Sequence, residues 1–145
     1  MFMDREELIK AALRECRRIF DKLKKQEESY TGKFGRFPET AYIYYCGSSL
    51  QKPTDHFDAS QRLRAWRLSG EGYEQLPDAQ QDAQTKPWSG MYYLTGVFAF
   101  CISEDGRTAK INMWLGPRYG RGFVYDVNDE WGAAFLTNQR TQWAS

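Results

Sequence analysis

The chain has 145 residues, 41% hydrophobic and 27% charged, which is the composition of a globular domain and not of a disordered segment. Its 20 basic and 19 acidic side chains leave a formal charge of +1. A protein that binds duplex DNA or an anionic membrane normally has a strong basic excess, so the charge argues against both classes. No apolar run approaches the roughly 20 residues of a membrane span, and the start, Met1 to Glu7, lacks the basic and apolar regions of a signal peptide. We therefore expect one cytoplasmic domain, in the host cell cytoplasm if the protein is viral.

The segment from Asp4 to Glu28 is predicted to form one long helix. Asp4, with Glu7 three residues later, resembles a capping box, and apolar residues follow at alternating spacings of four and three: Ile9, Leu13, Cys16, Phe20 and Leu23. Such a helix is roughly 37 Å long, at 1.5 Å per residue. It either lies on its own sheet or packs its far end against a second copy. From the length of the stripe we expect a homo-oligomer, a dimer or higher, with this helix in or beside the interface.

The middle of the chain predicts a strand and a hairpin. Thr40 to Cys46 is rich in tyrosine and β-branched residues, as strands are. Leu63–Leu68 and Tyr73–Leu76 flank a glycine-rich turn and fit a hairpin, with a short helix over 58–68 as the alternative. The polar stretches 52–60 and 77–90 are expected to be loops.

The last third predicts strands over 92–102, 109–115 and 121–127, with Asp105-Gly106 as the hairpin turn of the first two. Asn128-Asp129-Glu130 is expected to cap a short final helix through Trp131, Phe135 and Leu136. The predicted fold class is α+β, with a long N-terminal helix packed on an antiparallel β-sheet of five or six strands.

Signals for catalysis or metal binding are weak. The three cysteines, Cys16, Cys46 and Cys101, lack zinc-site spacing, and His56 is the only histidine. There is no Walker loop, GxSxG or HExxH motif. Asp129 and Glu130 lie close to Asp126, but the expected helix cap accounts for both. We therefore expect a non-enzymatic protein without metal or cofactor.

The segment Gly116–Gly122 carries the first candidate binding residues, Arg118, Tyr119 and Arg121. Arginine binds phosphate through two parallel hydrogen bonds and stacks on bases, and tyrosine adds an aromatic face and a hydroxyl. The neighbouring glycines allow a partner to approach the backbone. A solvated turn between strands is the alternative.

Two polar residues interrupt apolar strands. Asn112 lies in Ile111–Leu115, and Asp126 lies between Tyr125 and Val127. A buried asparagine requires partners for its amide, which a base edge or ribose would supply, and a carboxylate accepts hydrogen bonds from ribose hydroxyls. If these side chains face outward they are ordinary surface residues.

The long first helix, the following sheet and the Asn112–Asp126 spacing resemble the phage proteins that sequester cyclic nucleotide signals in anti-Thoeris defence. The resemblance covers roughly residues 98–126 and the overall plan. It implies that an aromatic residue, Phe98 or Phe100, lines a pocket for a cyclic ADP-ribose isomer together with Asn112, Val124 and Asp126. It also implies a second site for cyclic oligonucleotides, with Arg118 and Arg121 as candidate residues.

The leading hypothesis is thus a non-enzymatic binder that sequesters a small cyclic nucleotide and counters host antiviral signalling. The alternative is a phage or bacterial interaction module that docks on a host protein through exposed aromatic residues. Single-stranded nucleic acid is the weakest candidate partner because the net charge is near zero.

Overall fold

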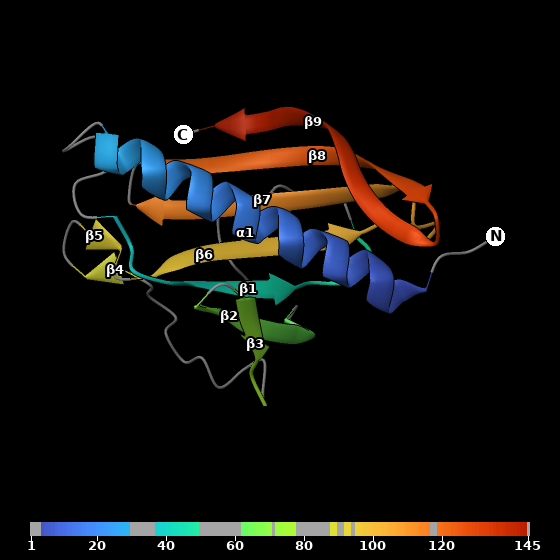
Figure 1. Ribbon diagram of the computed structural model, residues 1–145, viewed down its shortest axis with the longest axis horizontal. Helices are drawn as coiled ribbons and strands as arrows, with labels where there is room; N and C mark the ends of the chain where they lie inside the picture. The colour runs from blue at the N-terminus through green and yellow to red at the C-terminus, as the bar shows by residue number, and fades with distance from the viewer. Residues whose placement is uncertain are drawn as a thin grey trace.

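The computed structural model describes residues 4–29, 37–49, 62–70, 72–77, 88–89, 92–93, 95–116 and 119–144. Within them, helix α1 (Arg5–Ser29) lies across one face of a seven-stranded sheet (Figure 1). The strands of this sheet are β1 (Ala41–Tyr45), β2 (Arg64–Ser69), β3 (Gly72–Gln75), β6 (Gly96–Ile102), β7 (Thr108–Gly116), β8 (Tyr119–Glu130) and β9 (Ala133–Ala144). Two short strands, β4 (Trp88–Ser89) and β5 (Tyr92–Tyr93), form a separate pair. The structure thus confirms an α+β architecture, with an N-terminal helix and a mostly antiparallel sheet.

The sheet consists of two antiparallel halves that meet in one parallel pair. Its strand order is β3-β2-β1-β6-β7-β8-β9, and β1 runs parallel to β6, with Ala41 opposite Gly96 and Tyr45 opposite Phe100. The expectation of an antiparallel sheet of five or six strands therefore holds for most of the pairing, but the sheet has seven strands and one parallel pair. The parallel pair lies in the middle of the sheet, where both strands are mostly buried, as parallel strands usually are.

Helix α1 begins as the sequence predicts. The side chain of Asp4 accepts a hydrogen bond from the Glu6 amide at 3.2 Å, and its carbonyl oxygen accepts from the amides of Glu7 and Leu8. The acidic side chains of Glu6 and Glu7 lie in the first turn, where the helix dipole favours negative charge.

The apolar stripe of α1 is buried against the sheet of the same chain. The helix residues in this core are Leu8, Ile9, Ala11, Ala12, Leu13, Cys16, Ile19 and Phe20, with Leu23 packed at its margin. Of the two interpretations of the stripe, the structure therefore supports the one in which the helix lies on its own sheet. A homo-oligomer remains a prediction, but this stripe no longer supplies a surface for it.

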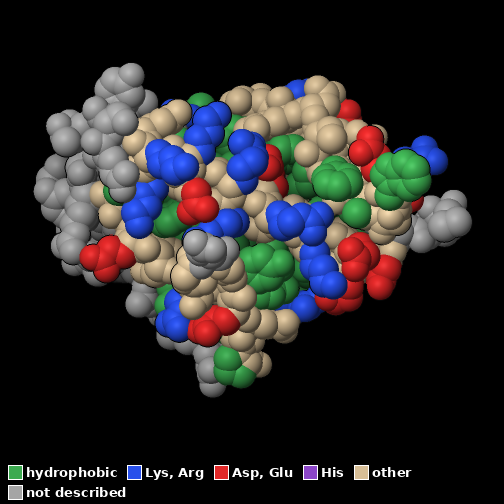
Figure 2. Space-filling model, viewed as in Figure 1, with side chains coloured by type: hydrophobic (Ala, Val, Ile, Leu, Met, Phe, Trp, Pro, Cys, Tyr) green, Lys and Arg blue, Asp and Glu red, His purple; other side chains and the backbone are tan. Residues whose placement is uncertain are grey.

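Arginines of α1 connect the helix to the two edge strands of the sheet, β9 and β3. Arg14 donates to the Ala134 carbonyl at 2.8 Å on β9, and Arg17 donates to the Gly72 carbonyl at 3.0 Å on β3. On the α1 side of the molecule, Lys and Arg side chains alternate with carboxylates (Figure 2). This face is therefore a solvated, mixed-charge surface over an apolar core.

Both predicted hairpins are present. β2 pairs with β3 as expected, so the alternative of a short helix over 58–68 fails, because residues 64–68 belong to strand β2. The β6–β7 turn has Gly106 at a φ of 72°, a conformation that glycine adopts without strain. Asp105 stabilises it by accepting from the Ser103 hydroxyl at 2.6 Å and the Arg107 amide at 3.0 Å.

The expected final helix is instead strand β9. β8 continues through Asn128-Asp129-Glu130, and Glu130 pairs with Ala133 across a two-residue turn. In this turn Trp131 and Gly132 have φ angles of 56° and 79°, which match the twist of a hairpin. The sequence-based prediction failed because tryptophan is not a typical residue for the first position of such a turn.

Several other expectations fall wholly or partly outside the described residues. The predicted loop at 52–60, with His56, lies outside them, and so do residues 78–87 of the predicted loop at 77–90; within that loop, Trp88–Ser89 form strand β4 instead. The predicted strand over 92–102 is present as two strands, β5 and β6. No helix in the described part of the chain is long and apolar enough to span a membrane.

Candidate ligand-binding site

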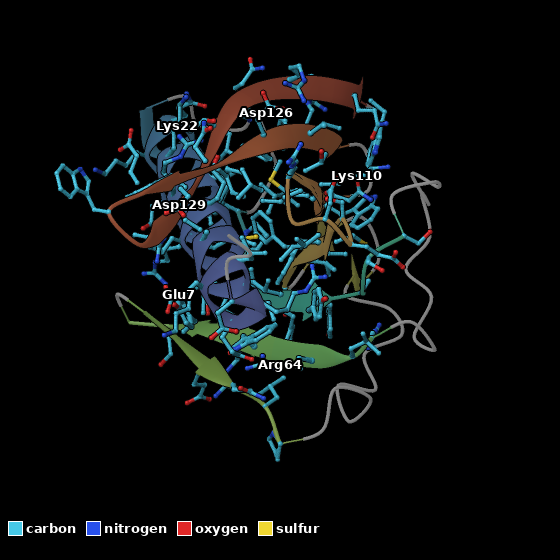
Figure 3. All side chains as sticks on the ribbon, turned by 90° about the vertical axis from the view of Figure 1, so that its right-hand side faces the viewer. Glu7, Lys22, Arg64, Lys110, Asp126 and Asp129 are labelled. Atoms are coloured by element: carbon cyan, nitrogen blue, oxygen red, sulfur yellow. The ribbon has the colours of Figure 1, made fainter. Side chains whose placement is uncertain are left out.

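Alternation along β7 divides its side chains between two environments. Ile111 and Met113 join the core beneath α1, so Lys110, Asn112 and Trp114 point to the opposite side of the sheet. Figure 3 shows Lys110 on the side of the sheet away from α1. We call this side the far face.

A row of side chains crosses the far face through Asn112. In the strand register, Tyr44, Ala99, Asn112, Gly122 and Trp143 are consecutive neighbours on β1, β6, β7, β8 and β9. Large and small residues thus alternate around the asparagine.

The indole of Trp143 fills the space above Gly122. A Cβ atom at Gly122 would lie 2.0 Å from Nε1 of that indole, so only glycine fits beneath it. From there Nε1 donates a hydrogen bond to Oδ1 of Asn112 at 3.0 Å. This contact fixes the orientation of the Asn112 amide. Its NH₂ group remains available as a donor, since no described residue accepts a hydrogen bond from that group.

Lys110 lies next to Asn112 on the same face and is 4% exposed. Its Nζ has no hydrogen-bond partner among the described residues. Burial lowers the pKa of Lys110, because an ammonium ion loses solvation inside a protein. An ammonium held here without a counter-charge is destabilising.

Cys101 lies directly opposite Lys110 on β6. Burial raises the pKa of this thiol, and the positive charge of Lys110 opposes that shift. The neutral thiol therefore supplies no compensating negative charge for Lys110.

Two tryptophans form the aromatic part of the site. The rings of Trp114 and Trp143 have centroids 5.8 Å apart and planes inclined by 38°. Trp114 also packs against an apolar cluster that includes Tyr44 and Val97. Indoles beside an amide donor and an ammonium suit a ligand that is flat, rich in acceptors and negatively charged.

Val124 and Asp126 also belong to the far face. Val124 lies between Lys110 on β7 and Arg140 on β9. The carboxylate of Asp126 accepts hydrogen bonds from Arg140 at 3.1 Å and Asn138 at 2.9 Å. These contacts lower the pKa of Asp126, and the hydrogen bond from Arg140 has the largest effect. The structure thus places Asn112, Val124 and Asp126 on one face, although Asp126 already has partners.

Phe98 and Phe100 lie on the other side of the sheet. They are 0% and 1% exposed and belong to the core beneath α1, where the Phe100 ring contacts Tyr45 at 5.3 Å and Trp66 at 6.1 Å between centroids. The placement of either phenylalanine in a pocket with Asn112 was therefore wrong. Trp114 and Trp143 supply the aromatic surface instead.

The arginine-tyrosine segment is only partly described. Arg118 and the side chain of Tyr119 lie outside the described part, and Tyr119 begins β8 opposite Gly116. Arg121 is paired with Met113, which places it on the α1 side of the sheet, and its Nη1 donates to the Gly120 carbonyl at 2.7 Å. The structure therefore does not place Arg121 on the face of Asn112.

Four residues of this site were not predicted from the sequence: Cys101, Lys110, Trp114 and Trp143. A period-two pattern applied to β7 would have placed Lys110 and Trp114 beside Asn112. Trp143 had no such signal, because its strand was expected to be a polar tail after a helix.

Among the described residues, no group of three or more His, Cys, Asp or Glu side chains is arranged to hold a metal ion. Comparison with protein-family models, with curated proteins and with solved structures finds no match to this chain. The function is therefore argued from the far face itself.

Proposed function

We propose that the protein binds a small cyclic nucleotide on the far face and withholds it from signalling, without chemical change. The observation that carries the proposal is the constellation around Asn112: an amide oriented by Trp143, a second indole, and the ammonium of Lys110 on the adjacent same-face position. Each group matches one part of a nucleotide.

The amide NH₂ of Asn112 would donate to an acceptor oxygen of the ligand, and the indoles would stack on the base. Stacking together with buried polar contacts slows ligand release, which sequestration requires. A cyclic ADP-ribose isomer or a cyclic oligonucleotide fits this chemistry. Removal of such a ligand would counter host antiviral signalling, as the resemblance in the sequence implies.

The direct test is recovery of the ligand. The protein would be incubated with cyclic ADP-ribose isomers and cyclic di- and trinucleotides, separated from free ligand and heat-denatured. We expect the bound ligand to return intact. Recovery of a cleaved product would instead make the protein an enzyme.

Substitution of the asparagine tests the site. Asn112→Asp replaces the NH₂ donor with an acceptor and should weaken binding at least about tenfold, the effect of one lost hydrogen bond of ~1.4 kcal/mol. Asn128→Asp is the matched control, because Asn128 is exposed near the β8–β9 turn and bonds to Thr137. Equal affinity of the two variants would contradict the proposed site.

A homo-oligomer is part of the same proposal, because small-ligand pockets are often completed at a subunit boundary. Light scattering at tens of micromolar protein measures the mass directly. A dimer or larger assembly is expected, and a strict monomer would remove this part of the proposal.

A second function, docking on a host protein, is favoured by the β8–β9 turn. Trp131 is fully exposed at this turn, next to the carboxylates of Asp129 and Glu130, and Phe135 is 44% exposed on β9. An exposed tryptophan is a frequent hot spot of protein interfaces. A thermal-shift panel separates the two functions, since a sequestering protein gains stability with a saturating nucleotide and a docking module does not.

A further inference from the structure

The far face holds a positive charge that its own groups do not neutralise. Lys110 is 4% exposed, and its Nζ contacts no acceptor among the described residues. Its cross-strand neighbours in the register are the thiol of Cys101 and the aliphatic side chain of Val124.

The carboxylate of Asp126, two positions along β8 from the cross-strand neighbour Val124, is already paired. Asp126, on β8, is bound by Arg140 and Asn138 of β9, and that ion pair is self-contained. Thr108, the residue opposite Asp126 on β7, carries no charge. No carboxylate of the described residues therefore lies within ion-pair distance of Lys110.

We propose that Lys110 and Asn112 form a phosphate-binding site, with the Lys110 ammonium and the Asn112 NH₂ group donating to phosphate oxygens. The two residues are two positions apart on one strand, so their Cα atoms lie about 7 Å apart. A pyrophosphate has oxygens on two phosphorus atoms, so both side chains can donate to it. Binding of the anion would also supply the missing counter-charge, because opposite charges attract most strongly where solvent is excluded.

This inference deepens the proposed function. The identity of the ligand as a nucleotide rests on that function, whereas the binding of phosphate at Lys110 does not. It assigns the phosphate of the ligand to Lys110 and leaves the indoles of Trp114 and Trp143 for the base. The charge of Lys110, in addition to shape, would then select phosphorylated ligands over nucleosides.

The test uses inorganic phosphate and pyrophosphate as probes, in a buffer free of other oxyanions. Calorimetry and thermal shift would be measured on the wild type, on Lys110→Met and on the control Lys22→Met, an exposed lysine of α1 (Figure 3). We expect pyrophosphate to raise the melting temperature of the wild type and of Lys22→Met by several degrees, and Lys110→Met to lose at least tenfold in affinity. No response of the wild type to either anion, or an unchanged response in Lys110→Met, would overturn the inference.

Alkylation of Cys101 provides a readout that needs no variant. Because this thiol lies opposite Lys110, a bound anion should slow its reaction with iodoacetamide. The extent of alkylation is measured by mass spectrometry of the peptide that contains Cys101. The peptide of Cys46, on the same face next to β1, serves as the internal reference. An alkylation rate of Cys101 that pyrophosphate does not change would contradict the site.

The outcomes separate this inference from the proposed function. If pyrophosphate binds at Lys110 but no cyclic nucleotide binds, the phosphate site stands and the proposed function fails. If a cyclic nucleotide binds equally well to the wild type and to Lys110→Met, the function stands and the phosphate site fails.

Discussion

The two faces of the sheet bury different kinds of side chain. The face under α1 buries aliphatic and aromatic side chains and the thiol of Cys16, and its conspicuous buried polar atom is the hydroxyl of Tyr125, on a ring that is 1% exposed. The far face buries Lys110 and Asn112 between two indoles and a thiol. Apolar burial explains the fold, whereas polar groups buried at a cost in stability are best explained by a ligand. The comparison therefore attributes stability to the α1 face and supports the proposal that the far face binds a ligand.

The largest expected effect comes from the α1 face. Phe98→Ala removes a fully buried ring from the middle of the core and should lower the free energy of unfolding by about 3–5 kcal/mol. Urea denaturation followed by circular dichroism measures this loss. Ligand affinity of the molecules that remain folded should not change, because the ring does not reach the far face. A selective loss of binding with normal stability would reverse the assignment of the two faces.

Gly122→Ala probes the far face by steric means. A methyl group would displace the indole of Trp143 and break its hydrogen bond to Asn112, so we expect a destabilisation of about 1–3 kcal/mol together with weaker binding. Tryptophan fluorescence and urea denaturation report both changes. Gly72→Ala is the control, because the nearest atom to its added Cβ, the Ser69 carbonyl oxygen, is at 3.9 Å. Identical behaviour of the two variants would show that Trp143 does not occupy this position.

Lys110→Met should be tolerated in the free protein, in contrast to the two substitutions above. Burial lowers the pKa of Lys110 from its ordinary value of 10.5, so the unfolded chain binds this proton more tightly than the folded protein does. Wild-type stability should therefore rise as the pH increases toward 10.5, and the variant should lack this contribution. At neutral pH, Lys110→Met should therefore be more stable than the wild type, as measured by urea denaturation. This difference should shrink as the pH rises over the same range. Lys22→Met should keep the wild-type pH profile.

Asp126→Asn should have the smallest effect. The carboxylate is exposed and its ion pair with Arg140 is screened by solvent, so we expect a slight fall in the melting temperature at neutral pH. The contacts lower the pKa of Asp126 from 3.8, so their contribution is present above that value and is lost as the pH falls through the folded-state pKa. The difference between wild type and variant should therefore vanish in acid. Asp129→Asn, at an exposed residue with no ion pair among the described residues, should leave the melting temperature unchanged.

Local patterns in the sequence predicted much of the fold. The stripe of α1, the Asp105-Gly106 turn and the β2–β3 hairpin depend on neighbouring residues, and the structure confirms all three. The parallel pairing of β1 with β6 depends on residues about fifty positions apart, which no local pattern encodes. The Trp131-Gly132 turn was missed for another reason, since its left-handed tryptophan is stabilised by the pairing of β8 with β9.

The candidate site was predicted only in part. Asn112, Val124 and Asp126 share a face because they lie at even spacings on paired strands, which the sequence indicates. The error concerned Phe98 and Phe100, because the register pairs Ala99, which lies between them, with Asn112, so both rings point to the opposite face. The contribution of Trp143 depends on the absence of a side chain at Gly122 on the neighbouring strand. Such a contact becomes visible only when the register is known.

The parallel pair in the middle of the sheet also has a consequence for how the chain folds. The meander β6–β9 and the meander β1–β3 each form from contacts between strands that are consecutive in that meander, whereas joining them pairs Ala41 with Gly96, about fifty positions later in the chain. Loop closure of this size carries an entropic cost that local hairpins do not. We therefore expect the two meanders to form first and their joining to limit the folding rate. Because the far-face row runs from Tyr44 across to Trp143, the face proposed to bind the ligand would be complete only after this last step.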